Sequence, residues 1–149
     1  MPKVRRAVAS DLDAMIELFQ HAPVSLVVTP IEPAREIWQQ TLAQDGVDVL
    51  VSEEDERIVS TCMLITVPNL LRGGHKHGFI ENVVTHDDYR RRGHGTAVIQ
   101  AALELARAQG CFHVMLQTGR QDPGVHQFYE RQGFTSENRV AYTVRYPET

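Results

Sequence analysis

The chain has 149 residues, of which 42% are hydrophobic and 23% are charged. This balance excludes the disordered, fibrous and disulfide-scaffold classes, and the length predicts one domain over residues 1–149. Nineteen acidic residues against fifteen Lys and Arg give a net charge of −4, so a nucleic-acid partner is not expected, because the chain as a whole would repel a polyanion.

Targeting and metal-binding patterns are missing from the sequence. It has no signal-peptide core and no apolar run of the roughly 20 residues that a membrane span needs, so we expect a cytoplasmic protein without a membrane partner. Cys62 and Cys111 lie in apolar runs and are expected to be reduced and buried. His75 and His77 form a pair without further ligands, so no metal site is predicted.

The first third of the chain is predicted to form a short strand and two helices. The strand covers residues 3–7. A capping-box pattern at Ser10 and apolar residues at helical spacing predict a helix over residues 10–22. A second helix is expected to begin at Pro33 and to stop at residues 45–46, with a loop between the two helices.

The middle of the chain is typical of strands. Alternating valines over residues 47–51, an acidic turn at residues 53–56 and a β-branched stretch over residues 58–67 predict an antiparallel hairpin. A loop rich in Gly and His is expected over residues 69–78. The apolar run at residues 79–85 is then predicted to be a central strand.

The last third alternates between helices and strands. The clearest helical spacing covers residues 95–109 and is closed by a glycine, and a strand is expected over residues 112–116. A short helix is predicted over residues 125–132. Residues 140–146 alternate between apolar and polar and predict a final strand. This order of elements indicates a mixed α/β layer fold.

A glycine turn between the central strand and the clearest helix carries the strongest functional signal. Glycines let the backbone approach a phosphate, and a helix start offers unpaired N–H groups to an anion. The turn lacks the Lys-Ser/Thr ending of a Walker loop and the three glycines of a dinucleotide site, so a different pyrophosphate ligand is expected. The predicted contacts are Arg90, Arg91, Arg92, Gly93, His94, Gly95 and Thr96.

This turn resembles the Gln/Arg-x-x-Gly-x-Gly/Ala signature of the GNAT superfamily of acyl-CoA-dependent N-acyltransferases. Residues 128–134 are similar to the Phe-Tyr-x-x-x-Gly-Phe segment of the same superfamily, and the expected element order from Arg5 to Phe134 also matches. The resemblance implies the GNAT fold, with a central, mixed, mostly antiparallel twisted sheet flanked by helices and splayed around the acyl-CoA site. It also implies acetyl-CoA as cosubstrate.

Two side chains are candidates for the chemistry of acetyl transfer to an amine. Glu81 would act as the base, because an ammonium group with a pKa near 10.4 has no lone pair; a structural ion pair is the alternative. Tyr129 would protonate the leaving thiolate; a packing role beside Phe128 is the alternative. The resemblance further implies that the backbone of Val83, Val84 and Thr85 binds the pantetheine arm and the oxyanion.

Three residues near the expected cofactor add no catalytic prediction. His94 and His126 have no recognisable catalytic partner in the sequence. Asp122 stands where an asparagine is frequent in the family, so the pantetheine contact of that asparagine is not transferred to this chain.

The resemblance implies an N-acetyltransferase that acts on a primary amine of a small molecule by direct attack in a ternary complex. Residues 80–84 resemble the Ile-Glu-Asp-Val-Val stretch of glucosamine-phosphate N-acetyltransferases, with Asn82 in place of Asp. Arg72, His75 and Lys76 would then meet an anionic group. A protein lysine or N-terminal acetyltransferase and a non-catalytic acyl-CoA sensor are the alternatives. A homodimer is expected, as in many relatives.

Overall fold

The computed structural model describes residues 2–24 and 30–147. The chain forms two compact units, Met1–Leu116 and Gln117–Thr149, and each is described by itself. The centre of the predicted loop between the first two helices, residues 25–29, lies outside the described residues.

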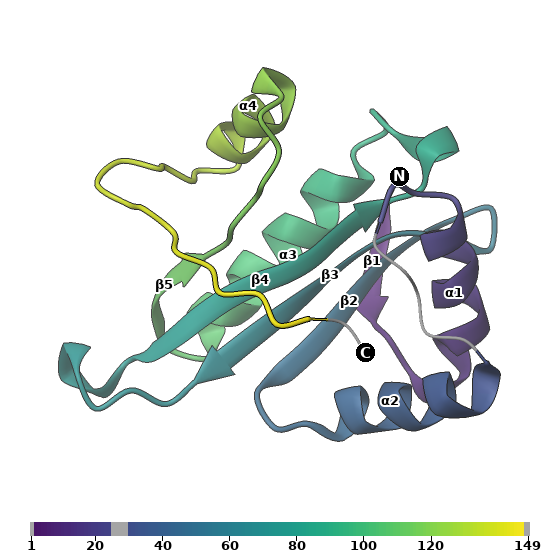
Figure 1. The fold of residues 1–149 in the computed structure, drawn as a ribbon, viewed down its shortest axis with the longest axis horizontal. Coiled ribbons are helices and arrows are strands. Elements are labelled where there is room, and N and C mark those ends of the chain that lie inside the picture. Colours follow the sequence, from purple (N-terminus) through teal and green to yellow (C-terminus); the bar gives the residue numbers. More distant parts are fainter. Residues whose placement is uncertain (1, 25–29, 148–149) are drawn as a thin grey trace. The chain divides into compact units, whose positions relative to one another are not determined.

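A five-stranded sheet forms the centre of the first unit, with the strands in the order β1-β2-β3-β4-β5 (Figure 1). The first four strands are antiparallel to their neighbours, and β5 is parallel to β4. The sheet is therefore mixed and mostly antiparallel, as predicted. The strands are β1 (Lys3–Arg6), β2 (Val47–Glu54), β3 (Arg57–Val67), β4 (Lys76–Thr85) and β5 (Cys111–Met115).

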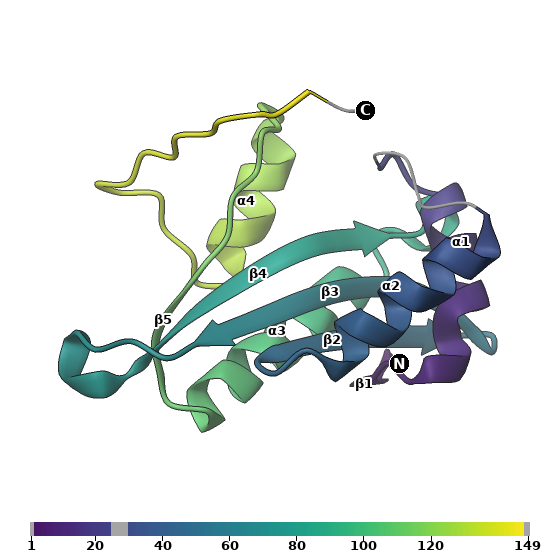
Figure 2. The ribbon, with the colours of Figure 1, turned by 60° about the horizontal axis from the view of Figure 1, so that its bottom comes forward.

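Helices cover both faces of this sheet (Figure 2). Helices α1 (Leu12–Gln20) and α2 (Ile31–Ala43) pack on one face, and α3 (His94–Ala108) packs on the other. The alternation along β2 shows the two layers: Val51 belongs to the core beneath α1 and α2, whereas the next residue, Ser52, bonds to the first residue of α3.

The entry into α1 differs from the predicted capping box. A 3-10 turn, Ala9–Asp11, precedes the helix, and the side chain of Asp11 accepts a hydrogen bond from the Val8 N–H at 2.7 Å. The same carboxylate pairs with Arg5 at 2.7 Å. Ser10 therefore does not cap the helix, because the aspartate one residue later satisfies both the free backbone donor and a strand arginine.

The hairpin of β2 and β3 closes as predicted. Asp55 and Glu56 have φ angles of 52° and 60°, which is the left-handed backbone that a two-residue hairpin turn needs at both central positions. No glycine fills either position.

Strand β4 begins at Lys76, three residues before the predicted start at Phe79. The parallel ladder with β5 recruits these residues into the sheet. Gly78 allows the close approach, because a Cβ at this position would lie 3.1 Å from a methyl group of Val114 and 3.2 Å from the carbonyl oxygen of His113.

The second unit contains α4 (Pro123–Arg131) and an extended C-terminal segment. The predicted strand over residues 140–146 is wrong: these residues adopt no strand. An alternating pattern becomes a strand only when another strand completes its hydrogen-bond ladder, and none does so in the part of the chain that the structure describes. Its apolar side chains stay exposed, namely Val140 (78%), Tyr142 (91%), Val144 (78%) and Tyr146 (84%).

Candidate functional site

A free backbone edge on β4 is the first component of the site. The ladder between β4 and β5 covers only the start of β4, from Lys76 to Phe79. Beyond that point β4 continues alone on this side (Figure 2), so residues 80–85 have no neighbouring strand there among the described residues. Their outward N–H and C=O groups are open to a ligand that can extend along the strand.

A bulge lies in the middle of this free edge. Met63 pairs with Glu81 and Thr61 pairs with Val84, so Asn82 and Val83 together face a single residue of β3. Asn82 has a φ of 53°, a left-handed conformation that asparagine tolerates better than most residues. Bulges re-aim the strand beside functional sites, and here the bulge changes the direction of the free edge.

Glu81 stands directly before the bulge and is exposed. Because cross-strand partners point to the same face of a sheet, its pairing with Met63 places Glu81 on the face that α1 and α2 cover. Glu81 makes no ion pair within residues 2–24 and 30–147. The alternative of a structural ion pair therefore receives no support.

Residues after the bulge are held by β3. The hydroxyl of Ser60 donates to the Val84 carbonyl at 3.0 Å and lies 2.9 Å from the Thr85 hydroxyl. The Val84 side chain is buried in the core, and the Val83 side chain is half-buried. The side chains of Val83 and Val84 thus serve packing, and only their backbone is available to a ligand.

The chain turns from β4 into α3 through a compact loop. His86 is buried, stacks on His21 with the ring centroids 4.7 Å apart, and accepts a hydrogen bond from the Asp88 N–H at 3.1 Å. The Nε2 atom of His86 is buried and has no partner within the described residues. These contacts fix where the glycine turn begins.

The start of α3 has the properties of an anion site. Gly93 occupies the N-cap with a φ of 86°, and no side chain caps the helix. The first backbone bond of the helix runs from the Ala97 N–H to the Gly93 carbonyl, so the N–H groups before Ala97 have no intrahelical acceptor. A helix of fifteen residues adds its dipole to these donors.

His94 has a different role from the one its position in the motif suggested. Its side chain is 1% exposed, its Nδ1 lies 2.7 Å from the Ser52 hydroxyl, and its Nε2 lies 3.2 Å from Glu54. The hydrogen bond from His94, together with Arg92, lowers the pKa of Glu54. Only the backbone N–H of His94 is left for a phosphate, and the side chain anchors the helix start to β2.

Ser52, His94 and Glu54 resemble the arrangement of a hydrolase triad. The hydroxyl-bearing residue is fully buried, however, with 0% of Ser52 exposed, and a nucleophile must reach its substrate. The arrangement is therefore structural.

The three arginines of the turn differ in their contacts. Arg92 pairs with Glu54 and lies over the Tyr89 ring, 4.9 Å from its centroid. Arg90 pairs with Asp87 at 3.0 Å. Arg91 is exposed and has a φ of 62°, and it forms no ion pair within the described residues.

The motif around Tyr129 has a local structural reason in the second unit. Helix α4 ends at Gly133, which has a φ of 100°. The N–H groups of Gly133 and Phe134 donate to the carbonyls of Glu130 and Tyr129, which is the Schellman arrangement. The rings of Tyr129 and Phe134 then pack edge to face, with centroids 6.0 Å apart.

Two residues of the second unit have structural roles that the sequence pattern did not indicate. Asp122 caps α4 by accepting from the Gly124 N–H at 2.9 Å. His126 lies 2.9 Å from the Arg120 carbonyl through its Nε2. An aspartate directly before Pro123 was the available signal, because this pair is typical of a helix start.

The remaining His and Cys side chains form no metal site. Within residues 2–24 and 30–147, no group of three or more His, Cys, Asp or Glu is arranged to hold a metal ion. His75 and His77 point to separate partners, the Gly110 carbonyl and His113. Both cysteines are free thiols, and burial raises the pKa of Cys62 to about 12.

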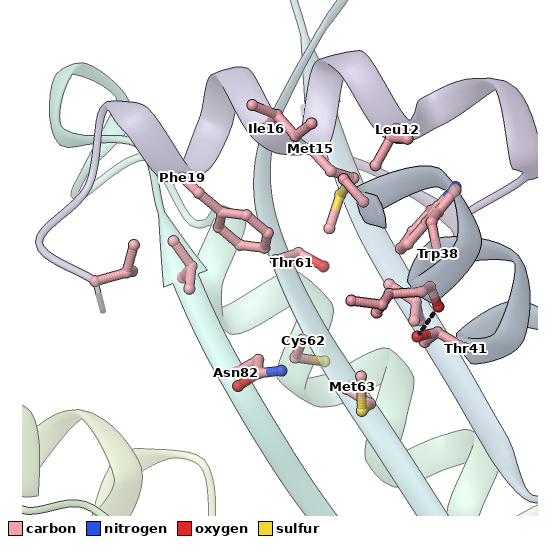
Figure 3. A pocket seen from close by; sticks show the side chains of 15 residues that line it. Leu12, Met15, Ile16, Phe19, Trp38, Thr41, Thr61, Cys62, Met63 and Asn82 are labelled. Carbon is pink, nitrogen blue, oxygen red and sulfur yellow. Dashed lines mark hydrogen bonds between the residues drawn. The ribbon is translucent and has the colours of Figure 1, made fainter. Parts of the chain in front are cut away.

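An apolar pocket of about 320 Å³ lies between α1, α2 and the sheet (Figure 3). The sequence analysis missed it, although the apolar faces of both helices were its signal. Leu12, Met15, Ile16 and Phe19 of α1 and Trp38 of α2 face Met63 and Asn82 of the sheet across it. No helix in the described part of the chain is long and apolar enough to cross a membrane.

The splayed mixed sheet followed by a glycine turn and a helix defines a class of acyltransferases, and comparison with known proteins identifies the family. The model of the acetyltransferase (GNAT) family matches residues 12–134. The chain belongs to the GNAT family and is an enzyme that transfers an acetyl group to an amine. GNAT enzymes generally use acetyl-CoA as cosubstrate.

Individual relatives agree with this assignment. The chain is 32% identical over 130 residues to a glucosamine 6-phosphate N-acetyltransferase of Trypanosoma brucei brucei, which covers 87% of this chain and 86% of the relative. A solved structure from Agrobacterium tumefaciens str. C58 is 39% identical, with a TM-score of 0.88 over 97% of this chain and 99% of the other. The glucosamine-6-phosphate N-acetyltransferase of Arabidopsis thaliana is 25% identical, with a TM-score of 0.82 over 99% of each chain.

Proposed function

We propose that this enzyme binds acetyl-CoA along the free edge of β4 and at the start of α3, and acetylates a primary amine of a small molecule in a ternary complex. The observation that carries the proposal is the junction of two features: the β4 edge is open from Ile80 to Thr85, and the uncapped start of α3 follows within ten residues. An extended ligand with a pyrophosphate end fits this order.

The residues of the junction fit acetyl-CoA. Backbone N–H groups from Gly93 to Thr96 would hold the pyrophosphate, and Arg91 would add a positive charge. The backbone of residues 83–85 would bind the pantetheine arm and supply a donor to the oxyanion. Acetyl-CoA supplies the activated thioester, and this chain supplies the binding groups and the proton transfers.

Glu81 is proposed as the base that takes a proton from the acceptor amine, directly or through a water. Its exposure and its lack of an ion pair in the described part of the chain support this role, because a paired carboxylate would be a weaker acceptor. Asn82 at the bulge is proposed to orient the acceptor.

Tyr129 is proposed as the acid that protonates the departing CoA thiolate. A tyrosine hydroxyl with a pKa near 10 is a suitable donor to a thiolate whose conjugate acid has a pKa near 8.5. The Schellman turn after α4 fixes the backbone of Tyr129, and Phe128 and Phe134 pack beside its ring, which supports a defined orientation for the hydroxyl.

A second candidate acceptor is glucosamine 6-phosphate, which the names of several relatives favour. Arg72, with its guanidinium 5.4 Å from the Phe112 ring centroid, and the neighbouring His75 and Lys76 would meet its phosphate. A protein amino group would be the third possibility, and a sensor without turnover the fourth.

A homodimer in the cytoplasm is also proposed. The exposed apolar side chains of residues 140–146 support the dimer, because a second copy would cover them and complete a ladder with the extended backbone. The two free thiols fit a reducing compartment.

The test is a free-thiol assay with acetyl-CoA and a panel of acceptors, with mass spectrometry of the products. The panel contains amino sugars including glucosamine 6-phosphate, polyamines, amino acids, and peptides with lysine or a free N-terminus. Thiol release that depends on a small amine and yields its N-acetyl product is expected. Release with peptides alone would replace the proposed substrate class, and acetyl-CoA binding without release from any acceptor would favour the sensor.

A further inference from the structure

The apolar pocket between α1, α2 and the sheet has no charged residue in its wall (Figure 3). Its only polar side chains are Thr41, Thr61 and Asn82. The hydroxyl of Thr41 donates to the Ile37 carbonyl and the hydroxyl of Thr61 donates to the Leu50 carbonyl, each at 2.8 Å. The Asn82 amide is therefore the one polar group of the wall that is not already donating to the protein's own backbone.

The pocket is joined to the proposed site of chemistry through β4. Asn82 of the bulge and Val84 line it. Glu81 precedes Asn82 and lies on the same face of the sheet as its partner Met63, which also lines the pocket. A molecule whose amine lies beside Glu81 would thus extend its body toward α1 and α2.

We propose that the acceptor is an amine carried by an apolar body, an alkylamine or arylalkylamine, whose body occupies this pocket while the amine faces Glu81. This inference rests on the proposed function and narrows its substrate class. A volume of about 320 Å³ lies at the lower end of the range of small-molecule pockets. A sugar phosphate would place hydroxyls and a dianion against an uncharged apolar wall and would lose hydration without compensation.

The first experiment measures kcat/KM for linear primary amines from ethylamine to octylamine, with 2-phenylethylamine and glucosamine 6-phosphate alongside. Each methylene that enters the pocket is expected to raise kcat/KM by about threefold to fourfold, until the pocket is full, because a buried methylene is worth about 0.8 kcal/mol. Specificity constants that do not depend on chain length, or that are highest for the sugar phosphate, would overturn the inference.

A second readout does not depend on turnover. Trp38 lines the pocket and is the only tryptophan of the chain, so its fluorescence reports directly on an occupant. Titration with hexylamine, without acetyl-CoA, should change the emission of Trp38 saturably, and glucosamine 6-phosphate should not. An unchanged emission with hexylamine would contradict an apolar ligand site here.

A pair of variants on α2 locates the effect. Ala34 is buried in the pocket wall, and Gln40 is exposed and outside it. Ala34→Phe should abolish the gain from longer amines while leaving the rate with ethylamine and the affinity for CoA largely unchanged, and Gln40→Phe should keep the gain. If Ala34→Phe does not fold, the chain-length series and the Trp38 titration still decide.

The outcomes separate this inference from the proposed function. A Trp38 response to hexylamine without thiol release from any amine would contradict the proposed acetylation and would still support the apolar ligand site. Efficient acetylation of polar amines without a chain-length effect would do the reverse. A preference for longer acyl-CoA in place of longer amines would assign the pocket to the acyl group and overturn the inference.

Discussion

Glu81 occupies an exposed position between two contrasting environments, the free edge of β4 and the apolar pocket. Replacement by glutamine keeps the size of the side chain and removes its ability to accept a proton. The steady-state rate should fall by about 10²-fold or more near neutral pH, where the acceptor is an ammonium ion. The deficit should shrink as the pH approaches the acceptor pKa, because the free amine then needs no base.

Glu104→Gln is the matched control for this variant, because Glu104 is exposed on α3 and lies outside the proposed site. Its pH–rate profile should match the wild type. A Glu81→Gln deficit that stays constant across the pH range would indicate a role in binding or folding and would remove the base assignment.

Tyr129 can be tested by removing only its hydroxyl. The ring packing with Phe128 and Phe134 is kept in Tyr129→Phe, so the melting temperature should stay within a few degrees of the wild type. We expect kcat at saturating acetyl-CoA to fall by about 10²-fold or more, with little change in KM. Tyr142→Phe, in the exposed C-terminal segment, serves as control. An unaltered kcat for Tyr129→Phe would leave the residue a packing role only.

Asp11 ties β1 to the start of α1 and makes stability depend on pH. Its hydrogen bonds from Arg5 lower its pKa below the ordinary value of 3.8. The contribution to stability is therefore complete above pH 3.8 and is lost as the pH falls through the lowered pKa of the folded protein. Asp11→Asn should cost about 1–3 kcal/mol of unfolding free energy at pH 7 and much less at pH 2.

Urea unfolding at the two pH values checks this expectation, with Asp13→Asn as control because Asp13 is exposed on the same helix. Equal costs for Asp11→Asn at both pH values would show that the carboxylate charge is not what stabilises the entry to α1.

At the scale of elements, the periodic patterns predicted most of the first unit. Helix α3 and the hairpin of β2 and β3 lie within one or two residues of their predicted bounds. These elements have a strong apolar repeat and a clear stop signal, such as Gly110 with its φ of 83°. The start of β4 was missed because its first residues belong to the sheet through β5, a partner that follows much later in the chain.

The candidate site was predictable in its motif and not in its geometry. The glycine turn and the Tyr129 segment stand out in the sequence, and the latter is explained by the Schellman turn at Gly133. The bulge at Asn82, the burial of His94 and the pocket under α2 depend on contacts between distant elements. The strand expected at residues 140–146 was wrong because alternation alone does not supply a ladder partner.

The glycine turn as an element can be tested by a change of charge at constant shape. Gly93 has a φ of 86°, and Asn and Asp are similar in size and tolerate this backbone to similar degrees. Gly93→Asn and Gly93→Asp should therefore carry similar strain. The aspartate alone brings a negative charge to the phosphate site, so its Kd for CoA should be about tenfold or more higher than that of the asparagine variant.

Calorimetric titration of both variants at low and moderate salt measures this difference, which should narrow as salt screens the added charge. Equal affinities of the two variants at low salt would place the pyrophosphate elsewhere.

At the scale of the whole molecule, the exposed C-terminal segment is the feature that a lone chain leaves unexplained. Tyr142 and Thr143 are neighbours on an extended backbone, where successive side chains point in opposite directions. If a second copy covers the apolar side, Tyr142→Glu should convert a dimer into a monomer and Thr143→Glu should not. Sedimentation velocity over a range of concentrations measures this. A wild-type monomer at all concentrations would contradict the proposed homodimer.

The central claim is that the β4 edge and the start of α3 together bind acetyl-CoA for transfer to an amine. Calorimetric titration of the wild-type protein with acetyl-CoA, before any acceptor is added, tests it most directly. We predict saturable binding with one site per chain, followed by release of free thiol when a suitable amine is added to the same sample. The absence of any binding would contradict the account at its foundation.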